Sequence, residues 1–309
     1  MSFPGGEEIM VEAPTRYDYS AIIDRPPLVF PGAAKVALWL IVNVEHYEYL
    51  PRPHPQRDPW PARPHPDVVN YARRDYGNRV GLWRMLDLLD RYELKATISI
   101  NAAVLDHYPH IAEALAARPV DFMGHGVYNT RYVAGLDVDA ERELIDDVQQ
   151  TVLRRTGRPV TGWLGPSLTT TPATPDLIAE AGVSYLADFL HDDEPCPLRV
   201  RTGRLVSMPY SLALNDSPLI GRMQHSAATF ARVVTDQFDV LYDEGRHRPK
   251  VLAVCLHPYA VNAPSRQEAL ERTLRYVVEQ PDVWVATGTE IATIGADAWW
   301  GGTSAEEQR

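Results

Sequence analysis

The residues best placed to do chemistry in this sequence are His125 and Asn129, which stand four positions apart after an apolar run that ends in Gly124. A histidine can bind a metal or act as a general acid or base, whereas an asparagine is a weaker, neutral oxygen donor. On a helical turn, residues four apart share one face, so we expect both side chains to reach the same ion or substrate atom. A hydrogen-bonded histidine in an ordinary strand-to-helix turn is the alternative that this stretch leaves open.

Other polar side chains stand just beyond apolar runs elsewhere in the chain. Together with the first pair, they are Asn43, Glu45, His46, Asn101, His125, Asn129, Asp188 and His257. In a barrel of parallel strands, the carboxyl ends of all strands meet at one face, where catalytic residues gather. We therefore expect these residues to converge although they are far apart in the sequence.

Eight apolar runs of strand length must position these side chains. They cover 35–44, 96–100, 119–123, 160–164, 183–187, 205–208, 251–256 and 283–286. The run 35–44 is almost continuously apolar, which is typical of a strand buried on both faces in a parallel sheet. Helical patterns separate most of the runs, and no long break in composition divides the chain. This alternation predicts an α/β fold with one distorted (β/α) barrel over residues 34–297.

Two local patterns add detail to this picture. Residues 75–78 predict a turn before an amphipathic helix over 79–92, with Trp83 on its buried face. Ser265 and Glu268 predict a capping box at the start of a later helix.

The segments outside the barrel differ from it in composition. Residues 1–33 are rich in proline, glycine and charge, which predicts an extended N-terminal arm that lies on its own domain or on a neighbouring subunit. Residues 298–309 are expected to form a flexible tail. The segment 46–74 is dense in proline, arginine and aromatic residues, so we expect Tyr47, Tyr49 and Trp60 to contribute to a lid or pocket wall.

Composition limits the compartment and the partners. The net charge of −11, with acids spread along the chain, argues against nucleic acid or anionic membranes as partners. No apolar window approaches about 20 residues, and acidic residues interrupt the first thirty, so we expect neither a membrane span nor a signal peptide. The two cysteines offer no disulfide framework. We expect a cytoplasmic protein that acts on a small molecule.

The motifs at these positions resemble those of the polysaccharide deacetylase superfamily, whose NodB-homology domain is a distorted, TIM-like barrel. The resemblance covers about residues 34–295. Its most specific parts are Tyr-Gly-Asn-Arg at 76–79, within a longer match over 75–84, and Leu-His-Pro at 256–258. Together they resemble the branch that contains the deacetylase-like allantoinase, cyclic-imide hydrolases and some peptidoglycan deacetylases. The other matching motifs lie at 43–45, 124–126, 162–163, 188, 192–193 and 209–210.

The resemblance implies hydrolysis of a carbon–nitrogen bond that is not a peptide bond, and a homo-oligomeric protein. It places Glu45 and His125 at metal-ligand positions and His257 at the general-acid position. The chain departs from the family at three positions. Asn43 stands in place of the aspartate base, Asn129 in place of the second metal histidine, and Leu164 in place of an orienting arginine.

These departures weaken the expected metal site. A catalytic zinc usually has three protein ligands and a water, so Glu45, His125 and an Asn129 oxygen would hold it poorly. We expect either no cofactor or one divalent, zinc-like metal there. Without a metal, Glu45 would be the base if burial raises its pKa towards neutrality, and His125 and His257 would polarise the carbonyl and protonate the leaving nitrogen. The residues expected to bind the substrate are Asn43, Asn129, Asp188, Trp163 and Tyr210.

Three functions remain open. The first is a hydrolase that opens a small cyclic amide such as allantoin, a hydantoin or a cyclic imide, which the altered metal site and the branch-specific motifs favour. The second is a metal-dependent deacetylase of an N-acetylated sugar or oligosaccharide. The third is a catalytically silent barrel retained for binding, which the three departures motivate.

Overall fold

The sheet of the computed structural model is built around β1 (Val36–Val44), in which all nine residues are buried. The structure describes residues 15–51, 66 and 68–301. Within them the strand order is β6-β7-β5-β4-β3-β2-β1-β8, and β9 pairs with the first half of β1. The remaining strands are β2 (Ala96–Ile100), β3 (Val120–Gly124), β4 (Val160–Trp163), β5 (Tyr185–Leu186), β6 (Cys196–Leu198), β7 (Leu205–Ser207), β8 (Lys250–Leu256) and β9 (Val283–Ala286).

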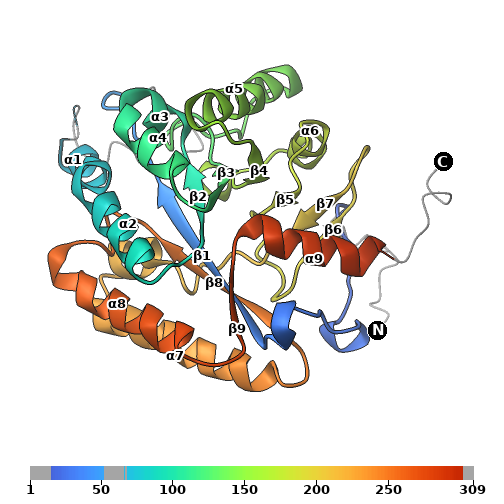
Figure 1. Ribbon diagram of the computed structural model, residues 1–309. Helices are drawn as coiled ribbons and strands as arrows, with labels where there is room; N and C mark the ends of the chain where they lie inside the picture. The colour runs from blue at the N-terminus through green and yellow to red at the C-terminus, as the bar shows by residue number, and fades with distance from the viewer. Residues whose placement is uncertain (1–14, 52–65, 67, 302–309) are drawn as a thin grey trace, which may run out of the picture.

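The strands pair in parallel except β6 and β7, so the sheet is mixed, and it curls into a half-barrel (Figure 1). This arrangement confirms the predicted distorted (β/α) barrel. The sequence did not predict β6, because it is three residues long and contains Pro197, which removes a backbone donor. Proline is tolerated in a sheet mainly at its edge, and β6 is the edge strand.

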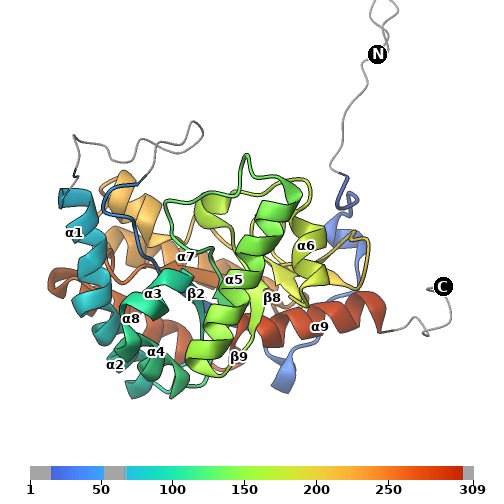
Figure 2. The same cartoon turned by 90° about the horizontal axis from the view of Figure 1, so that it is seen from above.

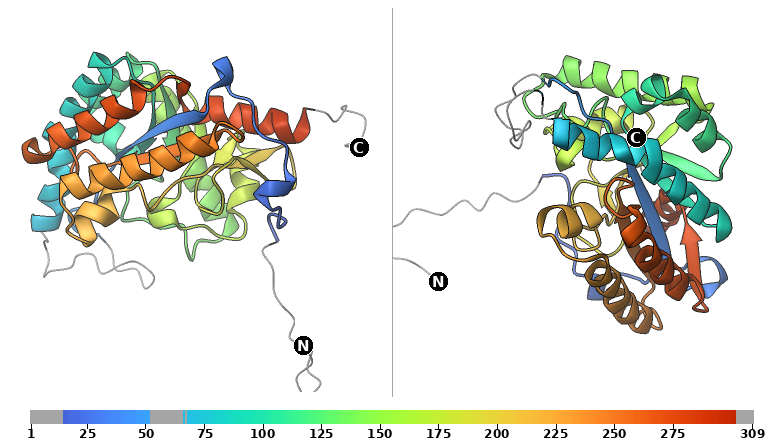
Figure 3. Two further views of the ribbon diagram at one scale, coloured as in Figure 1. Left: turned by 90° about the horizontal axis from the view of Figure 1, so that it is seen from below. Right: turned by 90° about the vertical axis from the view of Figure 1, so that its left-hand side faces the viewer.

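Helices cover the outside of the curled sheet. α3, α4 and α5 pack together on one side (Figure 2), and α7 and α8 lie side by side on another (Figure 3). Their bounds are α1 (Val68–Tyr76), the π-helical turn η3 (Gly77–Gly81), α2 (Leu82–Arg91), α3 (Ala102–His107), α4 (Pro109–Ala116), α5 (Val138–Thr156), α6 (Thr174–Glu180), the π-helical turn η5 (Ser217–Arg222), α7 (Ala227–Glu244), α8 (Pro264–Val278) and α9 (Gly288–Trp300). No helix of the described residues is long and apolar enough to cross a membrane.

Alternation along β1 separates two apolar cores. Leu38, Leu40 and Val42 pack outward against the helices, whereas Trp39 and Ile41 pack into the barrel interior. Successive side chains of a strand point to opposite faces, so the interior face continues to the odd-numbered positions 43 and 45. The strand that builds the core therefore also carries two polar side chains into the open end of the barrel.

The turn predicted at 75–78 is wrong. The helix continues from α1 through η3 into α2, with Gly77–Gly81 in π-helical conformation. The extra residue of a π turn shifts the buried face by one position, so Leu82 is fully buried. Trp83, which the sequence places in the core, is instead 41% exposed.

The predicted capping box at Ser265 and Glu268 is also wrong. α8 follows Ala263, which makes no side-chain cap, and Pro264 occupies its first turn. A proline at the first turn loses no helical hydrogen bond, so this start needs no cap. The capping box of the described chain is at α9, between Thr287 and Glu290.

The described part of the N-terminal arm lies against its own barrel. Arg16 forms a 2.8 Å ion pair with Asp176, and Arg25 forms one of 2.6 Å with Asp192. Phe30 is buried in the interior core. At the other end, α9 extends to Trp300, and residues 302–309 of the expected tail lie outside the described residues, as does Trp60.

Candidate active site

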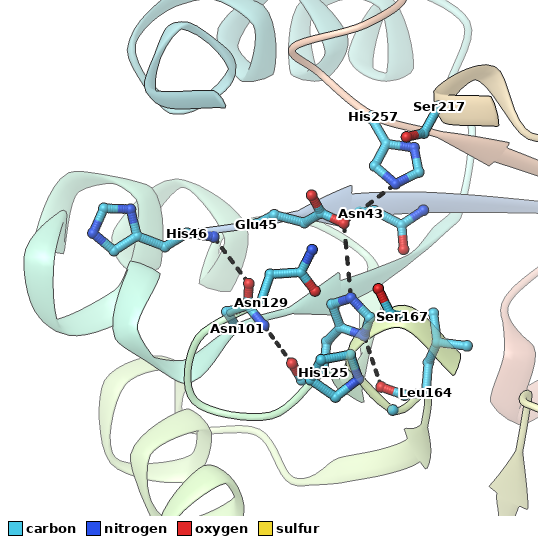
Figure 4. A network of polar contacts seen from close by, with 12 residues as sticks. Asn43, Glu45, His46, Asn101, His125, Asn129, Leu164, Ser167, Ser217 and His257 are labelled. Carbon is cyan, nitrogen blue, oxygen red and sulfur yellow. Dashed lines mark hydrogen bonds and ion pairs between the residues drawn. The ribbon is translucent and has the colours of Figure 1, made fainter. Parts of the chain in front are cut away.

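Three of the predicted side chains, Glu45, His125 and His257, meet at the open end of the barrel. Each continues the alternation of its strand on the face that points into the barrel interior. Met123 and Cys255 belong to the interior core, and the two histidines follow them two positions later. All three side chains are at most 6% exposed. Figure 4 shows the Glu45 carboxylate between the two imidazoles. Of the eight residues expected to converge, the structure places these three together, with both imidazoles within 3.8 Å of the Glu45 carboxylate.

Asp216 fixes His257 in one orientation. The carboxylate accepts the backbone N–H of His257 at 2.8 and 3.0 Å and the ring Nδ1–H at 2.7 Å. The opposite ring nitrogen, Nε2, lies 3.3 Å from Glu45 Oε1. Burial alone would lower the pKa of His257, but the charges of Glu45 and Asp216 outweigh it and raise the pKa to about 10. His257 is therefore an imidazolium at neutral pH and presents its Nε2 proton to the site.

Glu45 behaves differently from the sequence expectation. Burial favours a higher pKa, but the nearby His257 imidazolium and His125 hold the pKa of Glu45 well below its ordinary value. The expected rise towards neutrality is therefore wrong for the free enzyme, because the imidazolium lies within 3.3 Å of the carboxylate. In the resting site Glu45 is a carboxylate paired with a cation.

His125 is oriented by a backbone carbonyl. Its Nδ1 lies 2.7 Å from the oxygen of Leu164, and only a protonated nitrogen can donate to that oxygen. In the neutral ring this leaves a lone pair on Nε2, which faces Glu45 Oε1 at 3.8 Å. This tautomer suits His125 to accept a proton from water rather than to donate one to a carbonyl.

His125 and Asn129 do not share a helical turn, and that expectation is wrong. They lie in a loop after β3, and a hydrogen bond of 2.9 Å from Asn129 N to His46 O holds the loop against the end of β1. Asn129 Nδ2 donates to Tyr47 Oη at 2.8 Å, and that hydroxyl donates to Glu45 Oε2 at 3.1 Å. Asn129 Oδ1 is buried and has no hydrogen-bond partner.

The other predicted site residues divide into two groups. Asn43 and Tyr210 line the site, where Asn43 Nδ2 and Tyr210 Oη are 3.3 Å apart. Trp163 is fully buried in the outer core. Asp188 accepts hydrogen bonds from Gly165 N at 2.9 and 3.2 Å, next to the carbonyl that orients His125. Neither Trp163 nor Asp188 lines the pocket, so any influence of theirs on the substrate is indirect.

His46 and Asn101 lie beside the site rather than in it. His46 follows β1 and continues its even-numbered positions, which face outward. Its ring packs against Tyr108, Tyr128 and His107, away from Glu45 (Figure 4). Asn101 accepts the His46 N–H at 2.9 Å and donates to the carbonyl oxygen of His125. It thereby connects the ends of β1 and β3.

The helical turn η3 supports the site from behind. Asn78 Nδ2 donates to the backbone oxygen of Glu45 at 2.9 Å. A Cβ on Gly77 would lie 2.9 Å from Tyr259 N, and one on Gly81 would collide with the carbonyl oxygen of Pro258. Only glycine allows this close approach to the loop after His257. The motif at 75–79 therefore supports the end of β1 and the loop after β8, and none of its residues lines the pocket.

These side chains border a pocket of about 570 Å³. The volume falls within the range of small-molecule sites. Its walls include residues that the sequence analysis did not select: Arg73, Arg74, Ser167, Asn215, Ser217, Arg222 and Tyr259. They come from α1, from the loop after β4, from η5 and its preceding loop, and from the loop after β8, and no local pattern marks them. The sequence analysis did not select Asp216 either, although this residue contacts His257.

The residues present do not fit a three-ligand zinc centre. Within the described ranges, no three His, Cys, Asp or Glu side chains are grouped so that they could hold a metal ion. Asn129 offers a neutral amide oxygen where a third strong ligand is needed. Each ring nitrogen of His257 faces a carboxylate, Nδ1 that of Asp216 and Nε2 that of Glu45, so His257 serves as a proton donor to both. We therefore derive no catalytic step through a metal.

The curled, mixed half-barrel with ionisable side chains at its open end has the architecture of a NodB-homology barrel. Residues 66–186 match the family model described as polysaccharide deacetylase. Residues 66–186 therefore match a polysaccharide deacetylase (NodB-homology) domain, and the resemblance that the sequence motifs predict is confirmed there.

Individual relatives extend the similarity over most of the chain. A Schizosaccharomyces pombe protein, provisionally named a polysaccharide deacetylase, is 26% identical over 260 residues, which are 76% of this chain and 78% of that protein. The crystal structure of PuuE allantoinase has a TM-score of 0.77 and 26% identity, and the match covers 93% of this chain and 100% of that one. A Pseudomonas aeruginosa PAO1 structure, provisionally assigned as a polysaccharide deacetylase, has a TM-score of 0.79 and 28% identity over 88% and 95% of the two chains.

The Asp216 contact leads to a prediction about pH dependence. Removing its charge with Asp216→Asn should lower the pKa of His257 from about 10, because one of the two carboxylates that raise it is gone. His257 would then lose its proton at lower pH, and the alkaline limb of the kcat profile should move towards neutrality. A pH–rate profile and NMR titration of His257 measure this shift. Glu48→Gln, which removes a carboxylate that pairs with Arg131 and does not touch His257, should leave the alkaline limb in place. An unchanged limb in Asp216→Asn would show that His257 is not the titrating acid.

Proposed function

We propose that this protein hydrolyses the carbon–nitrogen bond of a small cyclic amide, with His257 as general acid and Glu45 as general base. The observation that carries the proposal is the pairing of a carboxylate and an imidazolium across 3.3 Å, with Asp216 behind the imidazolium. Such a pair supplies both proton transfers of amide hydrolysis from protein side chains alone.

The proposed reaction starts from water held between Glu45 and the Nε2 lone pair of His125. The water oxygen attacks the amide carbon, and one of its protons passes to Glu45. The Nε2 proton of His257 passes to the leaving nitrogen as the carbon–nitrogen bond breaks. The products are a carboxylic acid, which ionises into solvent, and an amine or urea nitrogen that keeps the proton from His257.

The charges of the pair explain how a carboxylate of low pKa can act as the base. As His257 gives up its proton, the positive charge that depresses the pKa of Glu45 disappears. Burial then dominates and favours the protonated carboxyl group. Afterwards the proton on Glu45 can return directly to His257 Nε2, 3.3 Å away, and restore the resting pair.

Three further observations favour a cyclic amide as the substrate. The pocket of about 570 Å³ is of small-molecule size. The unpartnered Asn129 Oδ1 can accept a ring N–H beside the scissile bond. The similarity to PuuE allantoinase spans nearly the whole chain. The names of the other relatives favour the second candidate, deacetylation of an N-acetylated sugar.

A substrate panel separates these candidates. We expect ring opening of at least one of allantoin, hydantoins and cyclic imides, measured by loss of ring absorbance and chromatography, with no acetate released from N-acetylglucosamine or its oligomers. Acetate release without any ring opening would overturn the proposal and favour the deacetylase. The same assay should be repeated after chelator dialysis, with metal measured by elemental analysis. Because the donor set does not fit zinc, we expect activity to survive with far less than one metal ion per chain.

A further inference from the structure

We propose that the hydroxyl of Tyr210 is a further catalytic group, which donates a hydrogen bond to the amide oxygen as negative charge develops on it. Asn43 and Asn215 are positioning residues that direct this O–H into the pocket. The inference rests on the proposed function, because it assumes that an amide is attacked beside Glu45.

The proposed reaction leaves the amide oxygen without a donor. Attack by water on the amide carbon moves negative charge onto that oxygen, and a preorganised donor there stabilises the transition state. The carboxylate of Glu45 can only accept, and His125 presents a lone pair on Nε2. The Nε2 proton of His257 passes to the leaving nitrogen. A fourth group must therefore bind the oxygen.

Three separate elements converge on the Tyr210 hydroxyl. Asn43 lies near the end of β1, Tyr210 follows β7, and Asn215 precedes η5. The Oη atom of Tyr210 is 3.3 Å from Asn43 Nδ2 and 3.1 Å from Asn215 Nδ2. All three residues line the pocket, although each is at most 6% exposed. Asn43 points to the same face of β1 as Glu45, two positions later (Figure 4).

Backbone contacts fix both amide groups as donors to Tyr210. The Nδ2 of Asn43 also lies 3.5 Å from the carbonyl oxygen of Leu256, which only an N–H can approach favourably. The Oδ1 of Asn215 accepts the N–H of Ser217 at 2.9 Å, so the opposite end of this amide, Nδ2, faces the hydroxyl. The oxygen of Tyr210 therefore accepts two hydrogen bonds.

The proton of Tyr210 must then point away from both amides. The thiol of Cys255 lies beside the hydroxyl, and sulfur is a weak acceptor. Burial raises the pKa of Tyr210 well above its ordinary value, so the hydroxyl keeps its proton at neutral pH. The two accepted hydrogen bonds also polarise the O–H. A substrate carbonyl in the pocket is a stronger acceptor than the thiol and would take this hydrogen bond.

The other hydroxyls of the described pocket differ from that of Tyr210, because each has a partner that can accept its proton. These contacts are Tyr47 to Glu45 at 3.1 Å, Thr130 to Glu48 at 2.7 Å, Ser217 with Tyr259 at 3.3 Å and Ser167 with Tyr132 at 2.9 Å. Both amides that contact Tyr210 are donors, which makes its hydroxyl the best placed of this group to serve a ligand.

The test measures ring opening of succinimide, hydantoin and allantoin by Tyr210→Phe, which keeps the ring and removes the hydroxyl. We expect kcat to fall by about 10²- to 10³-fold, as for the loss of one oxyanion donor. KM should rise by less than about tenfold, because the uncharged carbonyl gains only an ordinary hydrogen bond. The matched control is Tyr185→Phe, in the same interior core but outside the pocket, which should keep kcat within about twofold.

A second variant tests the role of Asn43. In Asn43→Asp a carboxylate would accept the Tyr210 proton and turn the O–H away from the pocket, so kcat should fall. Combined with Tyr210→Phe, the total loss should be smaller than the product of the two single losses, because both changes remove the same hydrogen bond. An unchanged kcat in Asn43→Asp, or a total equal to that product, would overturn the positioning role of Asn43.

The outcomes for Tyr210→Phe separate this inference from the proposed function. Wild-type kcat in the variant, or a rise in KM alone, would overturn the catalytic role of Tyr210 and leave the cyclic-amide proposal intact. If none of the three rings opens, the proposed function fails for them, and calorimetric binding of succinimide decides whether the hydroxyl serves a carbonyl ligand. Binding that is at least about threefold weaker in Tyr210→Phe than in wild type would support that role. Equal binding, or binding to neither protein, would overturn it.

Discussion

Replacing His257 with asparagine is expected to lower kcat for ring opening by about 10²- to 10⁴-fold, the usual contribution of a general acid. Nε2 of His257 is the only imidazole nitrogen of the described pocket that a fixed hydrogen-bond network requires to carry a proton facing the site. Asparagine retains a polar side chain of similar reach but cannot transfer a proton. Steady-state kinetics on the substrate found in the panel measure the loss, with circular dichroism to confirm that the variant folds.

His107→Asn is the matched control for this experiment. His107 lies outside the pocket, where its Nε2 contacts Tyr128 Oη at 2.9 Å, and its replacement should leave kcat within about twofold. If His257→Asn kept the wild-type kcat, the assignment of the general acid would be wrong. A folded wild type without any activity on the panel would instead favour the catalytically silent barrel.

Glu45→Gln should have an effect at least as large, together with a spectroscopic signature. Glutamine cannot accept the proton of water, so we expect kcat to fall by about 10³-fold or more. The same change removes the charge of Glu45, which raises the pKa of His257 more than the charge of Asp216 does. The pKa of His257 should therefore fall from about 10. NMR titration of the His257 ring measures this second effect even in an inactive variant.

The control for Glu45→Gln is Glu48→Gln. Glu48 pairs with Arg131 at 2.7 Å and does not line the pocket, so its replacement should change neither kcat nor the pKa of His257. A fall in kcat without a change in the His257 pKa would contradict the pairing of Glu45 with His257. A lower pKa with unchanged kcat would contradict the role of Glu45 as base.

The charged pair also determines how stability depends on pH. The pKa of His257 in the folded protein, about 10, lies above its ordinary value of 6.5. The stability that the proton contributes is therefore fully present below about pH 6.5, and it is lost as the pH rises through about 10. Deprotonation of His257 thus removes the proposed general acid and breaks the ion pair with Glu45 in the same pH range.

The sequence predicted the barrel and the three central side chains because both depend on local order. Runs buried on both faces identify strands, and strict alternation carries Glu45, His125 and His257 to the interior face. Asp216 could not be predicted, because it contacts a histidine 41 positions away through a loop whose path depends on the whole fold. Arg73 and Arg222 were missed for the same reason, since two separate elements bring them together.

The errors have physical causes of the same kind. Gly77 and its neighbours look like a turn because glycine is costly within a helix, and only the close contact with the loop after His257 compensates for that cost. Trp163 ends a strand and Asp188 follows one, as the pocket residues do. Trp163, at the end of the short strand β4, is nevertheless buried in the core, and Asp188, after the short strand β5, bonds to the backbone of Gly165. The alternation of side chains along a strand predicts which face of the sheet a residue lies on. Contacts with other side chains then decide which residues on that face reach a ligand.

The π-helical turn has a consequence for how this chain can change over generations. A π turn holds one residue more than an ordinary α-helical turn, and here that residue sets which side of the helix meets the loop after His257. Deleting or inserting a single residue between Gly77 and Gly81 would rotate the part of the helix after the change by about 100° relative to the part before it, so Asn78 and both glycines could not all keep their contacts. Point changes on the exposed side of the helix, at Trp83 for example, carry no such penalty. We therefore expect a change in the length of this segment to be tolerated less well than a change in most of its side chains.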